Sequence, residues 1–266
     1  MISYPVGDRR VQFEIVAPPG WIVDGTNTFY EPEVVNIISK VVRADDFVID
    51  AGANLGFFTM IMSQLVGKDG LVMAFEPDPK IFAELNQNIY ANQFTNVITS
   101  DLALADDDCE ADFWVYPKSG YSSFMPYDES VPHKVQVRKL DTLLQAFPVP
   151  RFMKIDCEGA EPWILRGAEK ILRRGVDYIV TEMNYEMMED FNLSKTDMRE
   201  FMHSLGYHMF LISLRDQEAD EYKIYHVPPD QPLIIECADE ARARVVNVMF
   251  SPYLDPLATE RNISHG

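Results

Sequence analysis

The sequence is poor in cysteine and in basic residues. Its three cysteines, Cys109, Cys157 and Cys237, form no C-x-x-C pair, which indicates neither a disulfide framework nor a zinc site. Lys and Arg number 23 against 42 Asp and Glu, so the net charge is −19. Because this charge repels phosphate backbones and anionic lipids, we expect no nucleic-acid or membrane partner.

Long apolar runs are also missing. No stretch approaches the ~20 apolar residues of a membrane span. Asp8, Arg9 and Arg10 stand where a signal peptide would need an apolar run, which predicts a cytoplasmic protein. Hydrophobic residues make up 47% and charged residues 24%, the balance of a folded globular chain. The 266 residues are enough for one large domain or two small ones.

The remaining pattern alternates short apolar runs with amphipathic stretches. Strands are expected at 47–50, 71–75, 97–99, 151–155, 178–181, 207–212 and 245–250. Helices are expected at 31–42, 57–65, 79–91 and 194–205, and another begins at Pro162 and contains Gly167. Apolar strands alternating with helices predict an α/β fold with a parallel sheet covered on both faces.

Three segments interrupt this alternation. Residues 1–30 are rich in turn formers. Residues 110–138 contain no good helix, but 111–115 and 135–138 are candidates for extra strands or a lid. Residues 214–244 are acidic and proline-punctuated, and we expect only a loop or short helix there. Without a repeat or a linker, 1–266 is interpreted as one domain, with an N-terminal extension and two insertions on the substrate side.

A glycine-containing turn follows the strand expected at 47–50. Ligands in open α/β sheets bind outside the carboxyl ends of the strands, where this turn lies. Gly52 and Gly56 permit backbone conformations that a Cβ would forbid, and Asn54 between them tolerates a positive φ. Glu76 follows Gly52 by 24 residues, where an acid can accept hydrogen bonds from both ribose hydroxyls. The glycine-containing turn and Glu76 together predict an adenosine-bearing cofactor.

The residues of the turn also distinguish between cofactors. A nicotinamide site needs G-x-G-x-x-G, but Asn54 replaces the middle glycine and Phe57 the last, and no G-K-[ST] motif is present. Asp50, just before the turn, would crowd a pyrophosphate with negative charge. It suits a cationic group instead, such as the amino group of S-adenosylmethionine. Electrostatics thus favours a methyl donor.

Five segments resemble those of a known family. In order, they are FVIDAGANLGFFT, FEPDP, RKLDTLL, MKIDCEGAEPWILRGA and YIVTEMN. Together they resemble FkbM-type S-adenosylmethionine-dependent methyltransferases over roughly residues 30–213. The resemblance implies the class I methyltransferase fold, a Rossmann-like seven-stranded, mostly parallel sheet with an antiparallel last strand and helices on both faces.

The resemblance also implies an activity. FkbM-type enzymes mostly methylate hydroxyl groups of sugars and natural products, so we expect O-methylation of a small sugar or secondary metabolite. Methylation of nitrogen or of a carboxylate on a peptide-derived product is a second possibility. A protein that binds S-adenosylmethionine without turnover is a third. The acceptor and the oligomeric state stay open.

Eight positions are assigned to the cofactor by the resemblance. Gly52, Asn54 and Gly56 would hold its methionine part, and Glu76 would bind the ribose. The other four are Asp101, which would face the adenine, Ala103 packing nearby, Glu31, which would close over the cofactor, and Ser123, which with Ser122 resembles a serine pair of the family.

Acids follow the strands expected at 151–155 and 178–181. Because an alcohol acceptor needs a base or a metal, Asp156, Glu158 and Glu182 are the candidate catalytic residues. Asp156 or Glu158 would be a base whose pKa is raised by its acidic neighbours. Alternatively, Asp156, Glu182 and Asn184 would offer oxygen ligands to Mg²⁺, which the resemblance does not require. Glu161 is expected to cap the helix that follows it.

Two neighbours of these acids have expected structural roles. Lys154 lies in an apolar strand and should pair with an acid rather than act as a nucleophile. Cys157 lies between Asp156 and Glu158, which should raise the pKa of its thiol and keep it unreactive.

Overall fold

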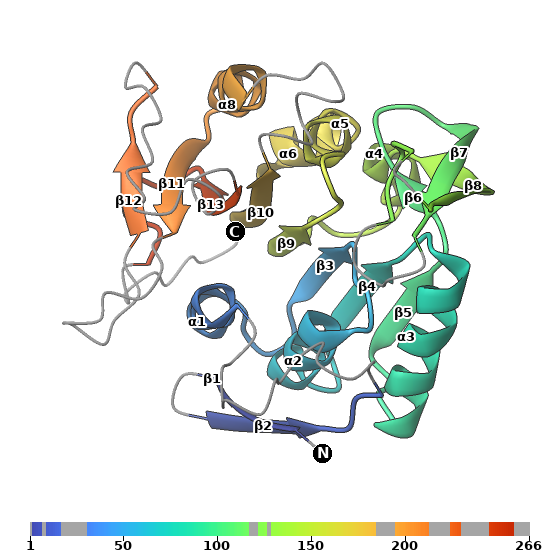
Figure 1. Ribbon diagram of the computed structural model, residues 1–266. Coiled ribbons are helices and arrows are strands. Elements are labelled where there is room, and N and C mark those ends of the chain that lie inside the picture. The colour runs from blue at the N-terminus through green and yellow to red at the C-terminus, as the bar shows by residue number, and fades with distance from the viewer. Residues whose placement is uncertain are drawn as a thin grey trace.

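The computed structural model describes residues 2–6, 9–16, 31–116, 122–126, 129–184, 195–212, 224–229 and 245–257. Its main sheet contains β3 (Phe47–Ala51), β4 (Leu71–Phe75), β5 (Val97–Ser100), β9 (Phe152–Ile155), β10 (Tyr178–Asn184), β11 (His208–Ile212), β12 (Ile224–Val227) and β13 (Val245–Ser251). The strand order is β12-β11-β13-β10-β9-β3-β4-β5 (Figure 1).

The directions of these strands confirm the expected fold class. The pairs β3–β4, β4–β5, β3–β9 and β9–β10 are parallel. The last strand, β13, is antiparallel to both of its neighbours, β10 and β11. The sheet is thus the expected seven-stranded, mostly parallel one, with β12 added at its edge by antiparallel pairing to β11.

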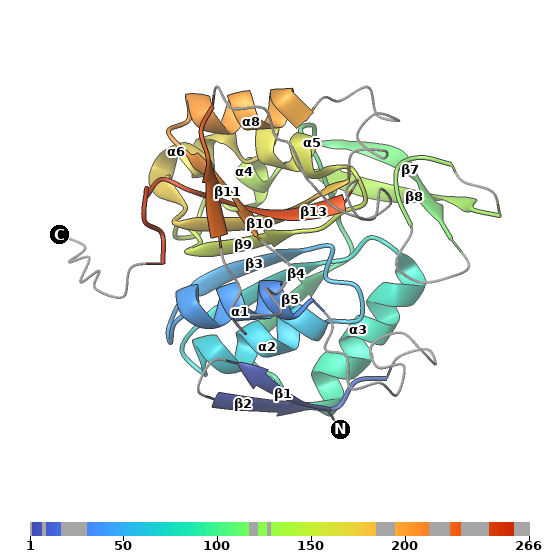
Figure 2. The same cartoon turned by 60° about the vertical axis from the view of Figure 1, so that its left-hand side comes forward.

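Helices cover both faces of the sheet (Figure 2). One face carries α1 (Pro32–Val41), α2 (Phe57–Val66) and α3 (Pro79–Ala91). The other carries α4 (Leu140–Leu143), α5 (Glu161–Arg166), α6 (Glu169–Gly175) and α8 (Lys195–Ser204). Successive residues of β3 point to opposite faces, so Val48 packs into the core under α1 and α2 and Ile49 into the core under α5 and α6. None of the described helices is long and apolar enough to cross a membrane.

A hairpin precedes the main sheet. Strands β1 (Ile2–Val6) and β2 (Arg9–Phe13) pair antiparallel and lie against the outer side of α1 and α2 (Figure 2). Val6, Val11 and Phe13 are buried there, and the Phe13 ring meets the Phe57 ring edge-on at 5.8 Å. The first part of the N-terminal extension is therefore packed onto the helical layer. Residues 17–30 lie outside the described residues.

The segment 110–138 contributes extra strands, as expected. A three-stranded sheet of order β6-β8-β7 contains β6 (Ala103–Leu104), β7 (Cys109–Val115) and β8 (Val131–Arg138). It has a small core of its own, in which Phe113, Val135 and Val137 are buried. The sheet lies beside the carboxyl ends of β4 and β5 (Figure 1).

Two expectations about secondary structure are wrong. The helix expected to run through Gly167 is broken there into α5 and α6. A Cβ at Gly167 would lie 2.0 Å from the carbonyl oxygen of Ala105, and the carboxylate of Asp141 accepts hydrogen bonds from the backbone N–H of Lys170 and Ile171 at the start of α6. Within 214–244, β12 is a strand rather than a loop or short helix; most of that segment lies outside the described residues.

Candidate functional site

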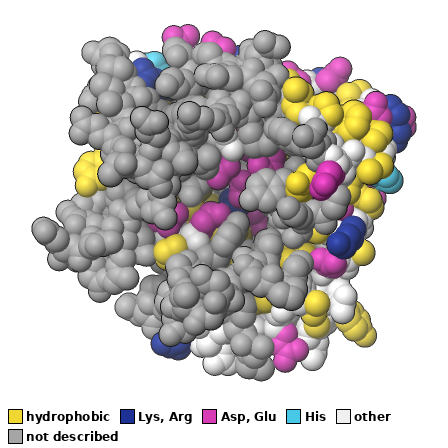
Figure 3. All heavy atoms as spheres, viewed as in Figure 1, with side chains coloured by type: hydrophobic (Ala, Val, Ile, Leu, Met, Phe, Trp, Pro, Cys, Tyr) yellow, Lys and Arg dark blue, Asp and Glu magenta, His cyan; other side chains and the backbone are white. Residues whose placement is uncertain are grey.

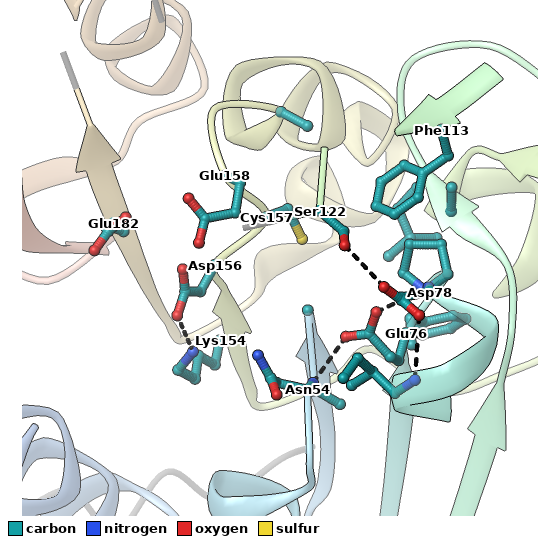
Figure 4. A pocket seen from close by; sticks show the side chains of 18 of the residues that line it. Asn54, Glu76, Asp78, Phe113, Ser122, Lys154, Asp156, Cys157, Glu158 and Glu182 are labelled. Atoms are coloured by element: carbon teal, nitrogen blue, oxygen red, sulfur yellow. Dashed lines mark hydrogen bonds and ion pairs between the residues drawn. The ribbon is translucent and has the colours of Figure 1, made fainter. Parts of the chain in front are cut away.

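A cavity of about 530 Å³ opens at the carboxyl ends of β3, β4, β9 and β10 (Figure 4). This volume lies within the roughly 300–1,000 Å³ usual for small-molecule sites. Its wall is built from the turn after β3, the residues after β4, the β6–β7 region, the loop after β9 and the end of β10. The cavity thus lies where open α/β sheets bind ligands.

The turn after β3 adopts the backbone that its residues predicted. Gly52, Asn54 and Gly56 have φ values of 77°, 50° and 89°. A Cβ at Gly52 would lie 1.8 Å from the carbonyl oxygen of Asp156, so the loop after β9 can approach only a glycine. Gly52 and Asn54 line the cavity, whereas Gly56 is the N-cap residue of α2 behind it.

Glu76, at the end of β4, is pinned by two backbone groups. Its Oε2 accepts a hydrogen bond from Asn54 N at 2.9 Å and its Oε1 one from Asp78 N at 3.0 Å. The side chain is 7% exposed and lines the cavity. Burial raises its pKa to about 7, although both hydrogen bonds act in the opposite direction. Because a carboxylate has about four lone-pair sites, each oxygen can accept a further hydrogen bond from a ligand.

Asp78 joins the cavity to the segment that follows β7. Its Oδ1 accepts hydrogen bonds from two backbone N–H groups at the start of α3, and its Oδ2 one from Ser122 Oγ at 2.8 Å. Ser122 therefore lines the cavity. The hydroxyl of Ser123 instead forms hydrogen bonds with the backbone of Met125. Ser123 is 1% exposed and is not among the residues of the cavity wall. The structure places Ser122, not the predicted Ser123, at the site.

The other predicted cofactor residues are divided between the cavity and its surroundings. Ala103 lines the cavity, beside the apolar side chains of Leu104 and Phe113. Asp101 lies at a separate cavity of about 150 Å³ on the far side of the residues that follow β4. Glu31 is the N-cap residue of α1, and it is not among the described lining residues of the large cavity.

Lys154 and Asp156 form a partly buried ion pair at the cavity wall. The Nζ of Lys154 lies 2.8 Å from Oδ2 of Asp156 and 4.5 Å from the centre of the Phe58 ring. Burial alone would lower the pKa of this lysine, but the surrounding carboxylates of Asp156, Glu31 and Asp50 together raise it. Lys154 therefore stays charged. Its expected pairing with an acid is confirmed.

Glu158 and Glu182 lie next to this ion pair (Figure 4). Both line the cavity, Glu158 from the loop after β9 and Glu182 from β10. Burial, followed by the negative charge of Asp156, raises the pKa of Glu158 to about 9 and that of Glu182 to about 10. At neutral pH each holds a proton and is able to donate a hydrogen bond to a ligand. Neither can take a proton from a ligand before it has lost its own.

The alternative metal set brings together Asp156, Glu182 and Asn184 at one end of the cavity wall. One oxygen of Asp156 is already bound by the ammonium group of Lys154. In the part of the chain that the structure describes, no three His, Cys, Asp or Glu side chains are arranged to hold a metal ion. Metal binding at this end would therefore depend on the amide of Asn184.

Three residues near the turn differ from expectation or refine it. Glu161 does not cap α5 but is its first residue, and its Oε1 accepts hydrogen bonds from the backbone N–H of Cys157 and Gly159. Asp50 is fully buried behind the turn and accepts a hydrogen bond from Thr59, so it does not face a ligand. Burial and neighbouring acids raise the pKa of the Cys157 thiol well above its usual range, as expected.

Several residues of the cavity wall were not predicted from the sequence. Asp78 carried a readable signal, because an aspartate directly before Pro79 has the pattern of an N-cap followed by a proline at the first helical position. Phe113 and Phe124, whose rings meet edge-on at 5.5 Å, carried none, since their place in the wall depends on the fold of the small sheet.

Comparison with known proteins gives consistent matches. Residues 50–209, more than half of the chain, match the methyltransferase FkbM domain family. Methyltransferase 1 of Beauveria bassiana is 27% identical over 175 residues, which cover 57% of this chain and 70% of that protein. Hexuronic acid methyltransferase AglP of Haloferax volcanii is 25% identical over 158 residues, which cover 58% and 62%.

Among solved structures, the chain is similar to a methyltransferase FkbM from Methylobacillus flagellatus. The TM-score is 0.49 and the sequence identity 16%, and the match covers 77% of this chain. The match spans only 43% of the Methylobacillus protein. The match to the Haloferax enzyme likewise spans only part of that enzyme, 62% of its length.

Proposed function

The chain belongs to the methyltransferase FkbM domain family, and on this premise we propose that it transfers the methyl group of S-adenosylmethionine to a hydroxyl of a small molecule, a sugar or a secondary metabolite. The observation that carries the proposal is the cavity itself. One end has the carboxylate of Glu76, the other end has Asp156, Glu158 and Glu182, and Asn54 of the glycine-containing turn lies between them (Figure 4). One end suits a nucleoside and the other a polar acceptor.

The cofactor end has groups that fit an adenosine. Glu76 has lone pairs directed at the cavity that can accept the two ribose hydroxyls. The apolar side chains of Ala103 and Phe113 would contact the adenine, and the turn at Gly52 and Asn54 would hold the methionine part. The volume of about 530 Å³ leaves room for an acceptor beside the cofactor.

The reaction asks little covalent chemistry of the chain. S-adenosylmethionine supplies an already activated methyl group, so the protein has to align the acceptor hydroxyl and exclude water. Glu158 and Glu182 would contact the acceptor beside this hydroxyl. Of the two candidate bases, we favour Asp156, because Glu158 keeps its proton up to about pH 9.

The proposed domain organisation follows from the same cavity. We propose that 1–266 act as one domain. The β6–β7 region contributes Phe113 to the wall on the side of Glu76 and Asp78. That part of the 110–138 insertion would therefore contact the cofactor, and the acceptor would meet the ends of β9 and β10.

Two measurements test the proposal in sequence. Calorimetric titration with S-adenosylhomocysteine should give one site per chain, and absence of binding would overturn the proposal. Incubation with S-adenosylmethionine and a panel of hydroxyl, amine and carboxyl acceptors should then add one methyl group to a hydroxyl compound, as measured by mass spectrometry. Methylation of amines or carboxylates alone would favour the second reaction class. Binding without any turnover would indicate a non-catalytic protein.

A further inference from the structure

The two ends of the cavity differ in how their acids are satisfied. At the cofactor end, Glu76 and Asp78 accept hydrogen bonds from backbone N–H groups, and Asp78 also accepts one from Ser122. At the other end, Glu158 and Glu182 have neither a hydrogen bond to their carboxyl groups nor an ion pair among the described residues. Both nevertheless lie in the wall of the same cavity.

The single cation among the described lining residues is already engaged. Lys154 is 3% exposed, with its ammonium group against Asp156 and the Phe58 ring. Its ammonium group is paired with Asp156, and among the described lining residues no second cation lies beside Glu158 and Glu182. Acidic side chains accordingly gather in the hollow at the centre of the face shown in Figure 3. Carboxyl groups removed from water are stable only when they are protonated or paired with a cation.

We propose, on the basis of the methyltransferase function above, that the methyl acceptor carries a protonated amine close to the hydroxyl that is methylated, and that Glu158 and Glu182 bind this amine. The substrate class is then an amino sugar or another amino alcohol. A uronic acid would instead bring a second negative charge beside the carboxylate of Asp156. The proposed class therefore differs from the substrate named for the Haloferax relative.

Charge complementarity agrees with this assignment. An ammonium group beside Glu158 and Glu182 favours the ionised form of a carboxyl group and donates hydrogen bonds to it. The net charge of −19 also attracts cationic ligands to the protein.

The test compares three sugars that differ in net charge. The protein is saturated with S-adenosylhomocysteine and titrated with 2-amino-2-deoxyglucose, glucose and glucuronic acid. The amino sugar should bind about tenfold or more tightly than glucose, the scale of a hydrogen bond to a charged group, and glucuronic acid most weakly. Equal affinities, a reversed order or no binding of the three would overturn the inference.

Variants assign the effect to the two glutamates. Glu158→Gln and Glu182→Gln should each lower the affinity for the amino sugar toward that for glucose. Glu200→Gln, at an exposed position on α8, is the matched control and should change nothing. Binding of S-adenosylhomocysteine reports that each variant is folded. If neither variant binds S-adenosylhomocysteine, the order of affinities of the three sugars for the unmodified protein decides whether the inference holds.

Two outcomes separate this inference from the proposed function. If the unmodified protein does not bind S-adenosylhomocysteine, the methyltransferase proposal fails. If it binds, but the glutamate variants lose affinity for S-adenosylmethionine and not for the amino sugar, the two acids serve the sulfonium group. In that case the substrate class is wrong while the methyltransferase function stands.

Discussion

Replacing Glu182 by Gln should stabilise the folded protein, and increasingly so as the pH rises. The change keeps the size of the side chain and its hydrogen-bonding capacity but removes its titration. In the folded protein burial raises the pKa of Glu182 to about 10, whereas the ordinary value is 4.5. Between these values the folded state holds a proton that the unfolded chain releases. The stability of the unmodified protein therefore falls as the pH rises through this window.

The size of the effect follows from the proton balance. One proton held only by the folded state costs about 1.4 kcal/mol per pH unit, so three units, from pH 5.5 to 8.5, set a ceiling of roughly 4 kcal/mol. Glu182 keeps some contact with solvent and lies beside Glu158 and Asp156, which ionise in the same environment. We therefore expect the stability advantage of Glu182→Gln to grow by about 2 kcal/mol over this range.

Urea unfolding without ligand, at pH 5.5, 7.0 and 8.5, measures this difference. Glu200→Gln, which changes an exposed glutamate of α8, should follow the unmodified protein at all three values. A constant gap between Glu182→Gln and the unmodified protein, or a gap that shrinks as the pH rises, would refute the assignment of a buried, protonated carboxyl group to β10.

Four further changes have expected outcomes. Glu76→Gln should weaken binding of S-adenosylhomocysteine by about 1–3 kcal/mol, measured by calorimetry, because the ribose loses a charged acceptor. Gly52→Ala should lower the unfolding free energy by roughly 2–4 kcal/mol, because its Cβ would meet the Asp156 carbonyl at positive φ. Asp141→Ala should lower it by about 1 kcal/mol, through loss of the side chain that caps α6. Excess EDTA should leave methyl transfer unchanged, and lost activity restored by Mg²⁺ would favour the metal alternative.

The sequence predicted the main sheet and its helices because their signals are local. Near-continuous apolar runs in β3, β9 and the first half of β10 indicated burial on both faces, and the spacing of apolar residues identified α1 and α2. Gly167 shows where local signals end. The helix breaks there because of contacts with Ala105 and Asp141, which lie far away in the chain. Strand β12 is a partly exposed edge strand, so it lacked an apolar signature.

The site divides in the same way. The positive φ of Asn54 and the position of Glu76 at the end of β4 followed from local rules. That Ser122 rather than Ser123 faces the cavity could not be predicted from local rules. Side chains alternate in direction along an extended segment, so adjacent residues point to opposite sides. Which of the two serines faces the cavity is fixed by an antiparallel backbone bridge between Ser123 and Trp114, and the sequence between them carries no strand pattern that would predict it. The sequence predicted that Lys154 pairs with an acid, but it did not predict that this ion pair lines a cavity.

A crystal structure of the protein with S-adenosylhomocysteine tests the central claim most directly. We predict both ribose hydroxyls within about 3 Å of the Glu76 carboxylate, the typical hydrogen-bond distance, with the adenine beside Ala103 and the sulfur directed toward Asp156. A nucleoside bound outside this cavity, or one whose ribose makes no contact with Glu76, would contradict the claim.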